Sequence, residues 1–358
     1  MISKYKCITL FLLTALTAEA ADLRSRVSTL ETQMNAISTK TAEGSIGAKT
    51  ASASPQILGM DWFLSADLLF WHANEGGTDY AVLFKNAPYG STAKAHTHTL
   101  NFGWDVGFRA GIGTYLNHDQ WDLYANFTQF QTDKSSSTSL HDGAFIIPLL
   151  GPILGDSRNQ ASQVKIGGNI VFYNLDFNLG RHYFVSRKLA FHPFIGIKSA
   201  WIAQHIHTQA SLVSPTTDVL HLNIKNDFWG IGPTLGIDGK WFMSHHFNLF
   251  GSIAGSLLWG TFDVHEKQRL QNRDQITFNV PFDRDLIVPT TQMQIGFGYE
   301  TNLFSNRYHL GINLRYEYQY WWQQNQMPYF PEPGTFKYKC SSEDLSLEGL
   351  TLDVRCDF

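Results

Sequence analysis

The sequence predicts an all-β fold, a transmembrane antiparallel β-barrel of about ten strands, and three observations carry this prediction. Segments in which apolar and polar side chains alternate recur from residue 61 to the end of the chain. The positions that the alternation assigns to the outer face carry no charge. Aromatic residues make up 14% of the chain and charged residues only 16%, which is unusual for a soluble enzyme.

The first element is a secretory signal peptide, expected over residues 1–20. Lys4 and Lys6 precede an apolar run from Cys7 to Leu16, and Ala18-Glu19-Ala20 forms a small-x-small cleavage site. Cys7 is therefore expected to leave with the signal.

Residues 21–40 are expected to form a short coiled coil or an amphipathic helix. Apolar residues recur there at alternating intervals of four and three: Leu23, Val27, Leu30, Met34 and Ile37. A helix of this length is marginal alone, so a segment that brings subunits together in a homo-oligomer and a frayed linker both stay open. Residues 41–58, rich in Ala, Ser, Thr and Gly, indicate a flexible linker, and the barrel domain is expected over 59–358.

The barrel strands follow in order, and the second is the clearest. Trp104, Val106 and Phe108 fall on its outer face, against Asp105 and Arg109 on its inner face. In the seventh strand the alternation is weaker. The ten expected strands cover residues 62–70, 104–113, 121–128, 171–179, 188–201, 229–240, 247–259, 293–300, 308–319 and 350–358.

The connections between these strands alternate between short turns and long loops of roughly 20 to 30 residues. In membrane barrels the short turns lie in the periplasm, and an even strand number returns both termini there. Residues 78–85, 219–225 and 275–280 could add strands, so the expected range is ten to fourteen.

A soluble β-sandwich alternates in the same way, but two features favour the membrane. A charge on the lipid face costs roughly 2–4 kcal/mol at mid-bilayer, and none is assigned there. Trp and Tyr gather at strand ends, as in interfacial aromatic girdles. The last strand ends on Phe358, and this ending resembles the signal that the barrel-assembly machinery recognises.

The inner faces carry charges of both signs, which favours a water-filled pore for small hydrophilic solutes or ions. A plugged barrel whose interior charges pair with one another is the alternative. The candidate pore-lining residues are Asp67, Asp105, Arg109, Asp122, Asp176, Lys188, Lys198, Lys240, Glu300, Arg315 and Glu317.

Two loop features add hypotheses. Residues 144–154 are apolar where a surface loop should be polar, so we expect them to constrict the lumen or to pack under other loops or a neighbouring subunit. His96 with His98, and His205 with His207, have a spacing that could bind a metal, but solvated loop histidines are commoner. We therefore expect no metal or cofactor.

Other function classes are less well supported. A net charge of −4 gives no basic footprint for nucleic acid, and no motif such as Gly-x-Ser-x-Gly indicates an enzyme. A surface adhesin or structural coat barrel stays open.

Cys340 and Cys356 are expected about 25 Å apart, at opposite ends of the last strand, too far for a disulfide.

Four segments resemble the legionella-type pore-forming outer-membrane proteins: Phe63–Trp71, Gly107–Gly113, Trp121–Thr128 and Leu175–Arg181. The likeness covers nearly the whole mature chain. It implies a porin in the outer membrane of a Gram-negative-type bacterium, in contact with outer-membrane lipid and similar in role to chlamydial major outer membrane proteins. Those proteins are rich in cross-linked cysteines, whereas this mature chain keeps two. The resemblance implies no catalytic residues.

Overall fold

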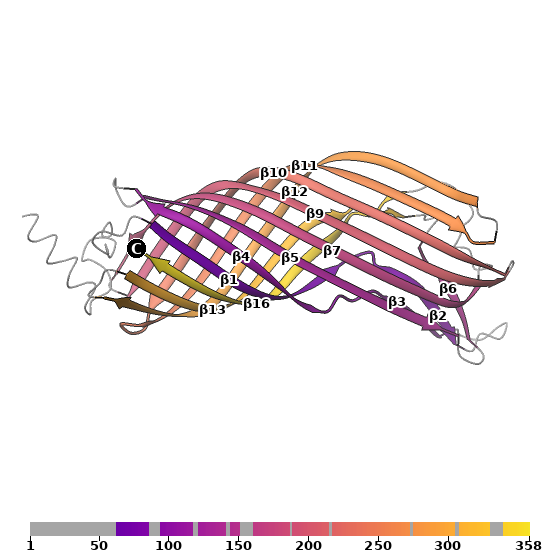
Figure 1. Cartoon of the computed structure of the whole chain (residues 1–358), viewed down its shortest axis with the longest axis horizontal. Helices are drawn as coiled ribbons and strands as arrows, with labels where there is room; N and C mark the ends of the chain where they lie inside the picture. Colours follow the sequence, from indigo (N-terminus) through magenta and orange to yellow (C-terminus); the bar gives the residue numbers. More distant parts are fainter. Residues whose placement is uncertain are drawn as a thin grey trace, which may run out of the picture.

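A computed structural model describes residues 62–85, 94–116, 121–140, 144–150, 160–186, 188–214, 217–272, 275–304, 308–329 and 339–358. It shows one long barrel with the C-terminus at one end (Figure 1). The expected signal peptide, coiled coil and linker lie outside the described residues. None of the described residues forms a helix long and apolar enough to cross a membrane.

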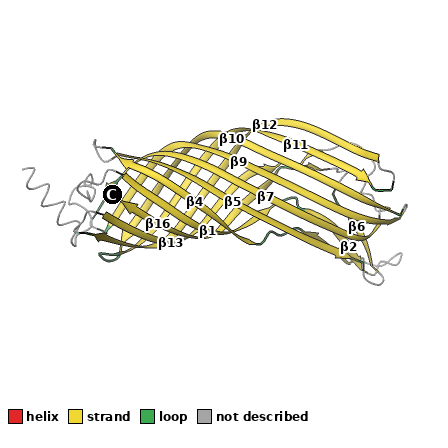
Figure 2. Ribbon diagram, in the orientation of Figure 1, coloured by secondary structure: helices red, strands yellow, loops and turns green. Residues whose placement is uncertain are grey.

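Ten antiparallel strands close the barrel, as expected (Figure 2). Each strand pairs with its neighbour along the chain, and the last closes the ring against the first. The ten strands are β1 (Trp62–Glu75), β4 (Trp104–Tyr115), β5 (Trp121–Ser139), β7 (Gln160–Arg181), β9 (Leu189–Ser214), β10 (Asp218–Phe242), β11 (Phe247–Leu270), β12 (Gln275–Leu303), β13 (Tyr308–Asn325) and β16 (Glu343–Asp357). Each expected segment lies within one of these strands, except that Lys188 and Phe358 lie just outside β9 and β16.

The remaining strands are short. β2 (Asp79–Lys85), β3 (Lys94–Thr99) and β6 (Ala144–Pro148) extend the sheet beside β7. β8 (Tyr183–Phe184) pairs with β9, and β14 (Pro328–Tyr329) pairs with β15 (Lys339–Cys340).

Long loops were predicted between several strands, and this prediction is wrong for several connections. The strands themselves continue far beyond the membrane, and short turns join them. Residues 271–274 alone separate β11 from β12, and residues 215–217 separate β9 from β10. Residues 219–225 and 275–280 are accordingly parts of β10 and β12 and not separate strands. Backbone hydrogen bonding continues outside the bilayer since each long strand keeps its partners.

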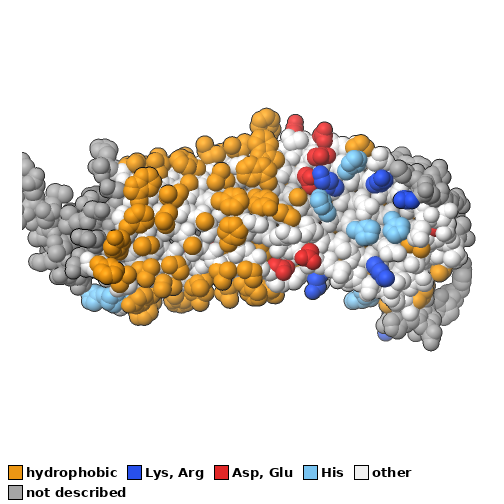
Figure 3. Space-filling model, in the orientation of Figure 1, with side chains coloured by type: hydrophobic (Ala, Val, Ile, Leu, Met, Phe, Trp, Pro, Cys, Tyr) orange, Lys and Arg blue, Asp and Glu red, His pale blue; other side chains and the backbone are white. Residues whose placement is uncertain are grey.

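The long strands change their apolar face midway along the barrel. Near the C-terminal end, apolar side chains point outward and form a belt around the barrel (Figure 3). In β10, Trp229 and Ile231 are outward and exposed, whereas Leu222 and Ile224 farther from the belt are buried inside. The barrel therefore has an inner half within the membrane and an outer half beyond it.

An aromatic row marks the boundary between the two halves. Tyr173 on β7 pairs with Trp201 on β9, and Trp201 pairs with Trp229 on β10. Such residues favour the membrane–water interface. Beyond this row charged residues and histidines appear on the surface among uncharged side chains (Figure 3).

The outer half of the barrel is filled by a hydrophobic core. Its largest members are Trp71, Phe130, Phe172 and Trp321, each with at most 1% of its surface exposed. The expected apolar segment at 144–154 contributes to this core: its first residues form β6, which pairs with β2, and Ile146 is fully buried. These residues close the outer lumen together with residues from most barrel strands.

The two cysteines are both free. Cys340 lies in β15 and pairs with Pro328 near the outer end, whereas Cys356 pairs with Leu64 and Leu310 near the C-terminus. The expectation that they do not bond to each other is confirmed.

Candidate functional site in the barrel interior

A buried layer of ion pairs lies on the inner face of four neighbouring strands, β4, β1, β16 and β13. The Arg109 guanidinium on β4 donates to both Glu317 carboxylate oxygens, at 2.7 and 3.2 Å, and to Asp67 Oδ2 at 3.0 Å. Arg315 on β13 pairs with the same Asp67 and lies 3.6 Å from Asp353 Oδ1. Alternation places all five of these residues on inner strand faces, but their convergence depends on how the ring closes.

Hydroxyl and amide groups complete this mid-barrel layer. Thr128 accepts a hydrogen bond from Arg109 Nε at 2.9 Å, and Thr351 donates to Glu317 at 3.2 Å. The Trp71 indole N–H donates in turn to Thr351 at 3.1 Å and connects the layer to the apolar core above it. Glu317 is fully buried, so its charge depends on these partners.

The predicted lining residues nearer the C-terminal end also pair with one another. Lys198 Nζ lies 2.7 Å from Asp176 Oδ1, and Lys240 pairs with Glu300. Asp105, closer to the boundary row, accepts a hydrogen bond from Thr132 at 2.5 Å.

Lys188 was placed wrongly. It is exposed in the turn just before β9 and does not lie on an inner strand face. The alternation was extended one residue too far, because the strand begins at Leu189. Lys188 is therefore no candidate for lining the lumen.

Below the ion-paired layer the lumen opens toward the C-terminal end. The side chains of Asp238, Lys240 and Arg355 keep 44%, 37% and 31% of their surfaces exposed. We call this region the periplasmic vestibule. Charged groups in contact with water therefore lie on the C-terminal side of the buried ion pairs, and the apolar core lies beyond them.

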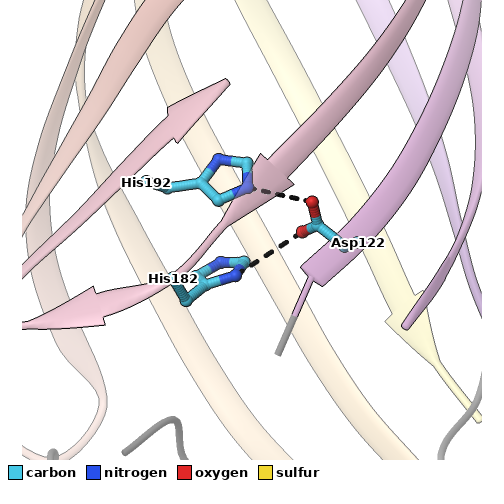
Figure 4. A group of neighbouring side chains, drawn as sticks. All are labelled: Asp122, His182 and His192. Atoms are coloured by element: carbon cyan, nitrogen blue, oxygen red, sulfur yellow. Dashed lines mark hydrogen bonds and ion pairs between the residues drawn. The ribbon is translucent and has the colours of Figure 1, made fainter. Parts of the chain in front are cut away.

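A cluster of two histidines and an aspartate sits at the mouth of the vestibule (Figure 4). Asp122 Oδ1 lies 3.0 Å from His192 Nε2, and Asp122 Oδ2 lies 3.5 Å from His182 Nδ1. Alternation identified Asp122 and put His192 on the inner face. His182 was missed because it lies in the turn after β7, where no periodic pattern applies.

The outward face of the outer half carries a hollow of about 740 Å³. We call it the outer groove. Two rows of cross-strand neighbours run through it: His205, Lys225 and His265 in one, and His207, Asn223, Lys267 and Asn279 in the other. The predicted pair of His205 and His207 is thus part of a wider surface of histidines and lysines, in which Asp227 pairs with His205 and Lys225.

Two buried carboxyl groups lie inside the outer half. No described residue hydrogen-bonds to the side chain of Glu75 or Glu266. Burial raises the pKa of each to about 8. Both groups are thus mainly protonated at neutral pH, which is how a buried carboxyl avoids the cost of an unpaired charge.

The closed antiparallel barrel, its apolar belt and its aromatic boundary agree with a family-level comparison. The model of the Legionella pneumophila major outer membrane protein precursor family matches residues 58–358. The chain belongs to this family. It is an outer-membrane protein of the type found in Gram-negative bacteria. A search of curated proteins found no match.

Solved structures that match this chain are distant in sequence. The Escherichia coli outer-membrane protease OmpT is 10% identical, with 83% of this chain and 97% of OmpT covered and a TM-score of 0.43. Ail, the attachment invasion locus protein of Yersinia pestis, is 12% identical, with coverage of 67% and 99% and a TM-score of 0.23. A FadL homologue of Pseudomonas aeruginosa is 9% identical, with coverage of 89% and 97% and a TM-score of 0.23.

Proposed function

We propose that this family member acts at the cell surface as a closed barrel, a structural coat component or adhesin, and not as an enzyme. The packed outer lumen carries the proposal: Trp71, Phe172 and Trp321 are buried across it. An interior packed in this way leaves little room for water. The outer half then serves as a stable support for the exposed polar surface that contains the outer groove.

Planar-bilayer recording of the refolded protein tests this proposal. Samples are first shown to be folded by heat-modifiable gel mobility, and a channel-forming barrel reconstituted in parallel serves as the control. A closed barrel gives no stable conductance steps. Regular steps from the folded wild-type protein would overturn the proposal.

A pore for small hydrophilic solutes or ions is the second candidate, and the charged periplasmic vestibule favours it. Asp238, Lys240 and Arg355 contact water there. Conduction would require the apolar core to rearrange. Rare openings in the wild type that become frequent in Trp321→Ala, but not in the outward control Leu257→Ala, would support a gated pore. Silence of both folded variants would exclude this route.

A further inference from the structure

The cluster at the vestibule mouth joins three parts of the chain that are distant in sequence. Asp122 lies at the start of β5, His182 follows β7, and His192 lies near the start of β9. The two imidazole rings are 4.2 Å apart between centroids, and both approach the same carboxylate (Figure 4). One metal-donor atom from each of these three residues lies within 4.8 Å of the donor atoms of the other two. Among the described His, Cys, Asp and Glu residues, these three form such a group.

These distances suit a metal ion. In a tetrahedral site with bonds of about 2.0–2.1 Å to nitrogen or oxygen, neighbouring donor atoms are roughly 3.3 Å apart. His192 Nε2 lies 3.0 Å from Asp122 Oδ1 and His182 Nδ1 lies 3.5 Å from Asp122 Oδ2. One donor atom from each of the three residues lies within 4.8 Å of the other two, so small side-chain rotations bring the set to this spacing. Two imidazoles and one carboxylate form a donor set used by zinc and similar transition metals.

An additional carboxylate orients one of these ligands. His192 Nδ1 lies 2.9 Å from Asp238 Oδ2, which favours a proton on Nδ1 and leaves Nε2 directed at Asp122. Ser252 donates to the other Asp238 oxygen at 2.6 Å. Histidine ligands of metals are commonly held by such a carboxylate behind the ring.

The barrel wall beside the cluster has a glycine, Gly180, and therefore no side chain at this position. Asp122 pairs across the sheet with Gly180, where an added Cβ would lie 2.1 Å from His192 Nε2 and 2.8 Å from Asp122 Oδ1. A side chain at this position would therefore displace the donor atoms. The nearby cations are already engaged, since Lys240 pairs with Glu300 and Arg355 with Asp357.

We propose that Asp122, His182 and His192 bind one divalent transition-metal ion of the zinc class at the vestibule mouth. His182 keeps 26% of its surface exposed and His192 19%, so a fourth position faces the vestibule and takes water. The ion would connect β5, the β7–β9 turn and β9, and it would stabilise the folded barrel by mass action. This site is independent of the proposed surface role.

Zinc binding to the refolded mature protein is the test, with equilibrium dialysis for stoichiometry and Co²⁺ absorption for coordination geometry. We expect one ion per chain, at least tenfold weaker binding for His182→Gln, and an intermediate loss for Asp238→Asn. His246→Gln, in the neighbouring β10–β11 turn, is the matched control and should bind normally. A His205→Gln/His207→Gln variant removes the outer-groove histidines and should also retain the ion.

Heat-modifiable mobility must show that each variant is folded. His182 is partly exposed and lies outside the strands, so its variant remains informative even where Asp122→Asn does not fold. Wild-type zinc affinity in folded His182→Gln would overturn the proposal. So would the absence of stoichiometric zinc, or a loss of binding only in the His205→Gln/His207→Gln variant.

Discussion

At the scale of single residues, Glu266 combines a polar group with an apolar surrounding. It lies on β11 between Val264 and Gln268 on the inner face, and it has no exposed surface. A charged carboxylate without a partner is costly there. The side chain therefore couples the stability of the outer half to pH.

We predict that Glu266→Gln stabilises the barrel at high pH. Its pKa is about 8 in the folded chain against a usual 4.5, so ionisation of the unfolded chain lowers the wild-type stability as pH rises between these values. Glutamine removes this loss, which amounts to about 3–5 kcal/mol at pH 9 and little at pH 4. Urea unfolding at pH 4 and at pH 9 measures this difference in the free energy of unfolding, with the exposed Glu343→Gln as the control. An equal effect of Glu266→Gln at both pH values would contradict the raised pKa of Glu266.

A second residue-scale prediction concerns the mid-barrel layer. Arg109→Met leaves the buried Glu317 without its main partner, and we expect a loss of about 3 kcal/mol in the free energy of unfolding. The double variant Arg109→Met/Glu317→Gln should recover much of it. Lys225→Met, which breaks an exposed pair with Asp227, should cost under about 1 kcal/mol. Equal losses of stability in Arg109→Met and Lys225→Met would show that burial does not determine how much an ion pair of this layer contributes.

Alternation predicted part of this layer and not the rest. Asp67, Arg109 and Glu317 were placed on inner faces because side-chain direction repeats every two residues in a strand. That Arg109 reaches Glu317 depends on the stagger of β1 and β16 between them, which only the closed ring fixes. His182 had no periodic signal because it lies in a turn.

At the scale of the element, β10 carries two alternation patterns of opposite phase. Trp229 and Ile231 face lipid, and farther out Leu222 and Ile224 face the interior. Strand lengths were predicted from the bilayer thickness, so each strand was ended near the aromatic row. The reversal itself is visible in the sequence, but it could be interpreted only after the outer half was seen to have its own core.

The phase reversal makes the cost of an outward charge depend on its position. Ile253→Arg on β11 puts a charge in the apolar belt, and we expect it to destabilise the barrel by roughly 2–4 kcal/mol in a bilayer. Thr261→Arg lies on the same strand and face but pairs with Trp229 in the boundary row, and it should cost under about 1 kcal/mol, because the penalty falls near the interface. Unfolding from lipid vesicles compares the free energies of unfolding of the two variants. Equal losses in Ile253→Arg and Thr261→Arg would mean that the apolar belt does not lie in lipid.

The outer groove supplies a second element-scale prediction. Lys267→Glu reverses a charge in the groove, and an adhesin that uses the lysines of this groove should bind anionic beads at least threefold less when displayed on cells. Lys188→Glu makes the same charge change at the opposite end of the barrel and should have no effect. Unchanged binding by both variants would remove the groove from the proposed surface role.

At the scale of the whole molecule, the ring of ten strands was predictable because lipid contact restricts every outward position in the same way. That side chains fill the outer lumen was not predictable from the sequence. Inner residues contact partners from several strands, and the sequence shows mixed charges without showing which of them pair. Alternation alone puts Trp71 and Phe172 on inner faces, but only the closed ring brings them into one core.

The length of the strands has a mechanical consequence. β7 and β9 remain paired over almost their whole length, from the outer tip to the C-terminal end. A force pulling the outer tip away from the cell would act along the strands and load their hydrogen bonds in parallel shear. Many bonds would have to fail together before one strand slid past the next. The same continuous sheet that anchors the protein in lipid would therefore let its outer end act as a stiff tether.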